Sequence, residues 1–444
     1  MSAYEQIDAR PLTGHQKSLI ALMVAGNISE FFDMFLIGFV VSVLTDAWRL
    51  TGIEAGVILA CSGLGTVIGS IVWGALGDRI GRKRVFQWCV SCFVSFTACS
   101  VFLSNGAWLA LAFLRIGVGM GVGGLNVTSI PYVQEFVPAR QRGMLSGLVS
   151  VFIPLGLLFG SLAQGIVGDD WRLLTALGTL PAFLLLWLRT VPESPRFHQL
   201  GGNSVLAREA LAWALEIPAA EVGALPQVRV TMMTARARYR ELFSRYLRPV
   251  AIVSLGSFCF ILGGFAVQSW GQTLLKDVFG LPTRMVAYLF IGVSIADCAG
   301  RFASAWLADV MGRRRTVALF GLVGALGCFY AAFIHDSAWQ FYGAVLVIMT
   351  FADGAFGILN VFGAEQFPNE VRSTGLGLGY GIGATAKIAG PAFLGALVGG
   401  GFISQRIDMS VITIAFSFFA ICLVVGAVIY LCARETRDTE LEEL

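Results

Sequence analysis

The sequence predicts an all-α membrane protein in which twelve transmembrane helices form two pseudo-symmetric six-helix bundles. Of its 444 residues, 56% are hydrophobic and 13% are charged, whereas soluble domains carry about 25% charged residues. A helix needs about 20 mostly apolar residues to cross a bilayer. Runs of this kind lie near residues 18–44, 54–76, 85–104, 107–131, 145–167, 172–189, 249–270, 284–308, 316–334, 339–362, 375–398 and 408–432. They are too long and too uniformly apolar for barrel strands, so helices must satisfy the backbone in lipid.

The placement of basic residues predicts the orientation of these helices. If both termini are cytoplasmic, 23 of the 31 lysines and arginines fall in cytoplasmic segments and five fall in outside loops. Positive charge accumulates on the cytoplasmic side of membrane proteins. We therefore expect an integral protein of the plasma (inner) membrane with both termini in the cytoplasm, surrounded by the lipid bilayer and monomeric.

The longest polar stretch divides the chain into three parts. We expect an N-terminal six-helix bundle in 1–189, a cytoplasmic linker in 190–248, and a C-terminal six-helix bundle with a cytoplasmic tail in 249–444. The linker contains helical patterns, and its basic, aromatic part from 236 to 248 is typical of a helix that lies along a membrane surface. We expect no nucleic-acid partner, because the net charge of the chain is only +3.

Two polar motifs of the first half recur in the second half. GDRIGRKR (77–84) recurs as ADVMGRRR (308–315), and EFVPARQRG (135–143) recurs as EQFPNEVRSTG (365–375). Both pairs are separated by nearly the same distance along the chain. Two independent motifs at one spacing indicate a duplicated six-helix unit, as in transporters whose two halves rock about a central site.

These motifs resemble those of the Major Facilitator Superfamily over essentially the whole chain. Gly74 to Arg84 is similar to the superfamily's loop motif between spans 2 and 3, and PYVQEFVPARQRG (131–143) and VPESPRF (191–197) are similar to motifs of its sugar porters. FFDMFLIGF (31–39) resembles span 1 of its aromatic-acid and nicotinate transporters. The resemblance implies a secondary transporter that works by alternating access and not an enzyme. Nothing in the sequence resembles a nucleotide-binding loop or a metal-ligand set, so we expect no cofactor and no metal.

The charged residues of the loop motifs are candidates for gating at the cytoplasmic side. Small residues around them would let spans 2 and 11, or 5 and 8, approach closely. The alternative interpretation is that these charges only direct topology and folding. The candidate gating residues are Asp78, Arg79, Arg82, Glu135, Arg142, Asp309, Arg313, Glu365 and Arg372.

Charges inside membrane spans are costly and mark function by default. In the first half, Glu30 and Asp33 share one face of span 1, and Arg115 shares a face of span 4 with Asn126. Resemblance to proton-coupled sugar porters implies that Asp33, assisted by Arg115, couples protons to transport, with Glu30 as a second candidate. The alternatives are a static buried pair, and a hydrated Glu30 near the extracellular half.

The second half holds the candidates for substrate binding. Asp297 and Arg301 are four residues apart and resemble span 8 of the monocarboxylate transporters. Lys387 lies midway along span 11, and its alternative role is as an internal partner of Asp353. Two buried cations favour an anionic solute. The predicted substrate-binding residues are Arg301, Lys387, Asp297, Tyr380, Asn126, Gln268 and Trp270.

We therefore predict proton-coupled symport of a small organic anion, an aromatic or monocarboxylic acid, with protons as the second partner. A proton-driven exporter of drugs or cationic metabolites would need net negative charge in the C-terminal cavity. A sugar or polyol symporter would need a face rich in amides, and FAVQSWGQT (265–273) lacks the adjacent glutamines of sugar porters. A membrane receptor without transport is the third alternative, and the duplicated motifs argue against it.

Overall fold

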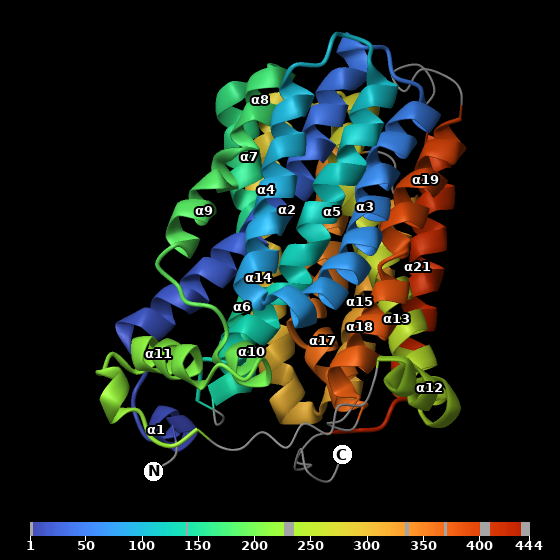
Figure 1. Ribbon diagram of the computed structural model, residues 1–444. Coiled ribbons are helices and arrows are strands. Elements are labelled where there is room, and N and C mark those ends of the chain that lie inside the picture. Colours follow the sequence, from blue (N-terminus) through green and yellow to red (C-terminus); the bar gives the residue numbers. More distant parts are fainter. Residues whose placement is uncertain are drawn as a thin grey trace.

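The computed structural model describes residues 3–138, 141–225, 235–333, 337–367, 371–399 and 409–436. Within this part of the chain, twelve helical segments are long and apolar enough to cross a membrane, which confirms the predicted number. Figure 1 shows them as one upright bundle, with the first and last segments of the chain at its lower end. We call this end the termini side.

The N-terminal bundle contains four continuous spans and two broken ones. The breaks occur beside Pro154 and Pro181, because proline lacks the N–H and clashes with the preceding turn of a helix. The elements are α2 (Gly14–Ala47), α3 (Gly52–Ile80), α4 (Arg82–Val101), α5 (Trp108–Gln134), α6 (Arg142–Val151) with α7 (Leu155–Val167), and α8 (Trp171–Leu177) with α9 (Phe183–Leu188).

The C-terminal bundle repeats this arrangement, but its interruptions include two π-helical turns. One follows α13, at Leu274–Val278, and the other divides the tenth span at Met349–Asp353. Such turns occur often at functional sites, and the second one carries Asp353. The elements are α13 (Leu247–Thr273), α14 (Thr283–Met311), α15 (Arg313–Phe333), α16 (Ala338–Ile348) with α17 (Phe356–Glu365), α18 (Arg372–Gly383) with α19 (Ala386–Val398), and α21 (Met409–Leu431).

Short helices outside the spans lie on the termini side (Figure 1). They are α1 (Ala3–Asp8), α10 (Pro195–Leu200), α11 (Ser204–Leu215) and α12 (Ala235–Arg245). Helix α11 packs against α1 through Ile7 and Leu211. The Thr13 hydroxyl, which caps the start of α2, also donates to the Ala214 carbonyl at 2.6 Å. The linker is thus attached to the beginning of the first span.

Glycine allows helices of different bundles to touch backbone to backbone. A Cβ atom at Gly56 of α3 would lie 2.9 Å from the Cα of Gly395 in α19, and one at Gly63 would lie 2.5 Å from the Lys387 carbonyl oxygen. Any side chain at these glycines would push the two helices apart. Spans 2 and 11 thus approach closely, but they do so at Gly56 and Gly63 and not at the loop motif, where Gly74 meets Val127 and Gly77 meets Arg82.

The bundles also bond to each other at the end opposite the termini. The Ile53 N–H donates to the Gly399 carbonyl at 3.2 Å. The Lys276 ammonium donates to the Ser42 carbonyl at 2.7 Å and contacts the Asp46 carboxylate at 2.6 Å. Together with the α3–α19 packing, these contacts close that end of the protein.

Candidate functional site

Seven charged side chains are buried among the residues that the structure describes. They are the seven that the sequence places inside spans: Glu30, Asp33, Arg115, Asp297, Arg301, Asp353 and Lys387. Four are carboxylates and three are cations. Because an isolated buried charge is strongly unfavourable, each is expected to contact an opposite charge.

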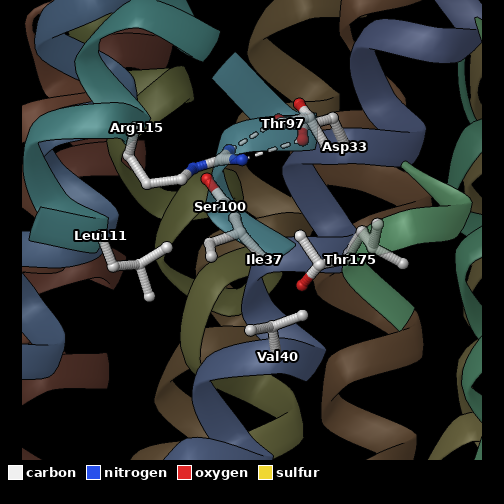
Figure 2. A pocket seen from close by; sticks show the side chains of 9 residues that line it. Asp33, Ile37, Val40, Thr97, Ser100, Leu111, Arg115 and Thr175 are labelled. Atoms are coloured by element: carbon white, nitrogen blue, oxygen red, sulfur yellow. Dashed lines mark hydrogen bonds and ion pairs between the residues drawn. The ribbon is translucent and has the colours of Figure 1, made fainter. Parts of the chain in front are cut away.

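Asp33 of α2 and Arg115 of α5 form a two-pronged ion pair inside the N-terminal bundle. The two guanidinium Nη atoms donate to the two carboxylate oxygens at 2.9 and 2.6 Å. Figure 2 shows this pair beside a cavity of about 10 Å³ that is lined also by Ser100 and Thr175. The predicted pairing is confirmed, and its role in proton coupling stays a prediction.

Ser62 of α3 holds the Arg115 guanidinium from its other side. The Arg115 Nε atom donates to the Ser62 hydroxyl at 2.9 Å. With Nε and both Nη atoms engaged, the guanidinium is fixed in one plane facing Asp33. The sequence analysis missed Ser62, since a serine in an apolar span carries no signal of its partner.

Arg301 of α14 contacts two carboxylates of the C-terminal bundle at once. Its Nε donates to Asp297, one turn earlier, at 3.1 Å, and an Nη donates to Asp353 at 2.5 Å. The Gln268 amide of α13 donates to the other Asp353 oxygen at 2.8 Å. The second carboxylate oxygen of Asp297 is buried with no hydrogen-bond donor among the described residues. If both acids were ionised, this group would carry one net negative charge.

Arg301 also reaches across to the N-terminal bundle. Its remaining Nη donates to the Ser150 carbonyl of α6 at 3.2 Å. Its guanidinium carbon lies 5.5 Å from the centroid of the Phe31 ring of α2 and 5.9 Å from that of Phe356. These distances allow cation–π attraction. Arg301 thus directs one N–H donor each to Asp297, Asp353 and the Ser150 carbonyl.

Lys387 of α19 pairs with Glu30 of α2 across the boundary between the bundles. The Lys387 Nζ atom lies 3.7 Å from a Glu30 carboxylate oxygen. Glu30 is 0% exposed, so it is not in contact with bulk solvent in this structure. The alternative pairing of Lys387 with Asp353 is also not what the structure shows, because Asp353 contacts Arg301 instead. The close approach of α3 and α19 at Gly63 and Lys387 brings this lysine to the boundary.

The remaining predicted substrate-binding residues differ in their surroundings. Trp270 is fully buried, Gln268 binds Asp353, and Tyr380 is partly buried. The side chain of Asn126 lies outside the described part of the structure. Gln272, one turn after Gln268, is fully buried, and neither of its amide atoms has a partner among the described residues.

Two matching networks of the predicted gate residues lie on the termini side. In the N-terminal bundle, Arg82 lies 3.7 Å from Glu135. In the C-terminal bundle, Arg313 lies 2.8 Å from Glu365 and 3.7 Å from the largely exposed Asp309. These pairs hold each loop to its own bundle and do not join the bundles. Arg79 is exposed, and the side chains of the predicted gate residues Asp78, Arg142 and Arg372 lie outside the described part.

Two further glutamates complete these networks and were missed by the sequence analysis. Glu193 accepts from the Lys83 and Arg84 N–H groups at the start of α4, at 2.9 and 3.4 Å. Glu435 accepts from the Arg313 and Arg314 N–H groups at the start of α15, one residue earlier in the aligned motif, at 3.0 and 3.2 Å. Each carboxylate thus caps a helix N-terminus, where negative charge is favourable.

A hydroxyl next to each capping glutamate binds the glutamate of the gate pair. Ser194 donates to Glu135, and Thr436 donates to Glu365 at 2.5 Å. Burial raises the pKa of the Glu135 carboxyl above its usual value, although Ser194 and Arg82 act in the opposite direction. Glu135 and Glu365 thus have the same kinds of partners in the two bundles, namely an arginine and a hydroxyl.

The arrangement as a whole can bind an anion at buried cations and hold protons on buried carboxylates. No group of three or more histidine, cysteine or acidic side chains that could bind a metal occurs among the described residues.

Comparisons with known proteins agree with this architecture. The Major Facilitator Superfamily model matches residues 23–391. The chain is 27% identical over 451 aligned positions to the niacin transporter NiaP of Acinetobacter baylyi, covering 100% of both chains. It is 28% identical over 420 positions to the gallate transporter of Pseudomonas putida, covering 91% of this chain and 89% of that one.

The fold is similar to that of the xylose transporter XylE from E. coli, with a TM-score of 0.75 and 19% identity over 96% of this chain and 99% of that chain. A duplicated twelve-helix bundle with this sequence likeness over its length belongs to the Major Facilitator Superfamily, and the chain is an integral membrane transporter of that superfamily.

Proposed function

We propose that this transporter carries a small organic anion, an aromatic or monocarboxylic acid, together with protons. The observation that carries the proposal is the pair of buried cations, Arg301 and Lys387, at the boundary between the bundles. Each contacts a group of the opposite bundle: Arg301 binds the Ser150 carbonyl, and Lys387 faces Glu30. A solute carboxylate that binds between the bundles can replace a protein group on one of these cations.

The two relatives support the same class of substrate. Niacin and gallate, which their names give as substrates, are both aromatic carboxylic acids. A carboxylate forms charge-assisted hydrogen bonds with arginine and lysine, and an aromatic ring can contact Phe31 or Trp270. Sugars offer no charge to these cations.

The balance of buried charge supports proton coupling. The described part of the site contains four carboxylates and three cations, and an anionic substrate adds another negative charge. Low-dielectric surroundings make uncompensated charge expensive, so buried acids tend to take up protons instead. Binding a proton with each substrate anion leaves the net charge of the site unchanged. We infer that Asp33, controlled by Arg115, is the principal proton-binding carboxylate.

The test is transport by the purified protein in proteoliposomes. With the inside alkaline, nicotinate or gallate is expected to accumulate, and collapsing the pH gradient with a protonophore should stop accumulation. Xylose and a quaternary ammonium cation serve as the neutral and cationic controls. Accumulation of xylose alone would support a sugar symporter, and expulsion of the cation against its gradient would support an exporter.

The orientation has its own test. We infer that the termini side is cytoplasmic, because most lysines and arginines are at that end. A reporter fused after Leu444 should be active only when the C-terminus is in the cytoplasm. A signal from the opposite side of the membrane would place the termini side, with its two networks of predicted gate residues, outside the cytoplasm.

The gate networks are expected to control turnover and not substrate affinity. Glu365→Gln weakens the contact with Arg313 at a position far from Arg301 and Lys387. We expect several-fold slower transport with unchanged binding affinity, measured as initial uptake rates and as binding titrations. Glu135→Gln is the matched variant in the other bundle and should act in the same way. A changed substrate profile at an unchanged rate would contradict the gating role.

A further inference from the structure

We propose that the Glu30–Lys387 pair is an exchangeable contact between the bundles, in which Glu30 occupies the position on Lys387 that the substrate carboxylate takes. When substrate displaces it, Glu30 binds a proton. This inference rests on the proposed function, since it requires an anionic substrate, and it adds Glu30 as the group that receives the coupled proton from Asp33.

The location of the pair is its first distinguishing feature. Two ion pairs between described residues join the bundles. One is Lys276–Asp46, in which the Asp46 side chain is 57% exposed at the closed end. The other is Lys387–Glu30, in which both side chains are at most 8% exposed. Bulk water can replace the partner of an exposed charge, whereas Lys387 is shielded from bulk water and needs a buried group or a bound ligand as its counter-charge.

The geometry of the pair is the second feature. Nζ and Oε1 are 3.7 Å apart, whereas the shortest contacts are 2.6 Å in the Asp33–Arg115 pair and 2.5 Å in the Arg301–Asp353 pair. Arginine holds a carboxylate with a planar fork, while lysine acts as a point charge with rotatable donors. Of the three buried cations, Lys387 is therefore the easiest to transfer from one carboxylate to another.

A small cavity connects this pair to the Asp33–Arg115 pair. It measures about 20 Å³, and all four side chains of the two pairs line it. A space of about 10–15 Å³ is enough to hold one water molecule when polar groups surround it. Glu30 and Asp33 are three residues apart on α2 and share this cavity, so one water molecule can bridge their carboxylates.

This connection defines a proton transfer. Asp33 takes up a proton from solution and passes it through the water to Glu30: the O–H bond on Asp33 breaks, and an O–H bond on Glu30 forms. Asp33 is then a carboxylate paired with Arg115, Glu30 is a neutral acid, and Lys387 pairs with the substrate carboxylate. Before substrate binds, and again after the proton transfer, Arg115 and Lys387 each have one anionic partner. The other titratable group near it is Tyr380 of α18, which also interacts with Lys387, Arg301 and Asp353.

Exchange also separates the bundles at this point. While Glu30 is ionised, Lys387 attracts α19 to α2. Once substrate holds Lys387 and Glu30 is neutral, this attraction ends. Loading of substrate and proton would thus remove one inter-bundle contact that resists rocking.

The experiment measures nicotinate and gallate binding to purified full-length protein by calorimetry. Titrations in buffers of different ionisation enthalpy give the number of protons taken up per bound anion. Wild type is expected to take up about one proton near neutral pH. Glu30→Gln imitates the neutral acid, so it should bind about tenfold more tightly and take up less than half as many protons. Lys387→Gln should bind at least tenfold more weakly, as expected for loss of one charge-assisted contact.

Two controls separate this role from a structural one. The double variant Glu30→Gln/Lys387→Gln leaves no unpaired charge, so it should fold and should bind as weakly as Lys387→Gln alone. Asp46→Asn removes the carboxylate of the other inter-bundle pair and should leave both affinity and proton uptake unchanged. Equal proton uptake in wild type and Glu30→Gln would overturn the inference while the proposed function stands. Failure of wild type to bind either anion would overturn both.

Discussion

Asp33→Asn is expected to abolish uphill accumulation of substrate while binding and exchange remain measurable. The pair with Arg115 is formed by two hydrogen bonds to an ionised carboxylate. An asparagine can accept one of these bonds, but it cannot gain or lose a proton at physiological pH. In the variant, protonation would therefore no longer form or break the ion pair with Arg115, and the pH gradient could not drive transport through this pair. The contact between Ser62 and the guanidinium would remain.

The size of this effect follows from the driving force. For one proton per substrate, a gradient of one pH unit supports about tenfold accumulation, since it corresponds to about 1.4 kcal/mol. In Asp33→Asn the ratio of inside to outside concentration should fall to one. Ratios are measured in proteoliposomes at steady state, and Asp46→Asn is the matched control with normal accumulation expected. If Asp33→Asn still concentrates substrate, Glu30 or Asp353 must carry the coupled proton.

Arg301→Lys is expected to weaken substrate binding by about ten- to a hundredfold, although the charge is kept. This corresponds to about 1.5–3 kcal/mol, the range for one charge-assisted hydrogen bond. The guanidinium donates in three directions, to Asp297, Asp353 and the Ser150 carbonyl. A lysine at this position cannot reach all three groups and offer a planar fork to a carboxylate as well.

The measurement is a binding titration with nicotinate and gallate, accompanied by thermal unfolding. The unfolding temperature shows whether weaker binding comes from a less stable protein. Arg301 compensates two buried acids, and a variant that leaves them uncompensated will be less stable. Arg313→Lys at the gate is the matched control: it should slow transport without changing affinity. Normal binding by Arg301→Lys would exclude this arginine as the anion site and leave Lys387 in that role.

The sequence by itself determined the membrane spans, the repeat and the set of buried charges. Spans can be predicted because the cost of placing a segment in lipid depends on its own composition and length. The seven buried charges could be identified for the same reason, since each charge inside an apolar run is conspicuous. The Asp33–Arg115 pairing was predictable from helix faces together with the family resemblance.

Other pairings could be decided only by the tertiary structure. Glu30 and Lys387 lie at opposite ends of the sequence, and their contact depends on how closely α3 and α19 approach through Gly63. Asp353 was offered as a partner of Lys387, but it lies on the π-helical turn Met349–Asp353 and contacts Arg301, while Asp297 also remains in contact with Arg301. Glu193 and Glu435 follow the last spans of their bundles, and nothing local indicates that they cap α4 and α15. Such partners depend on the rotation and packing of whole helices against one another, because many helix orientations bury the same apolar surface but only one brings these charges together.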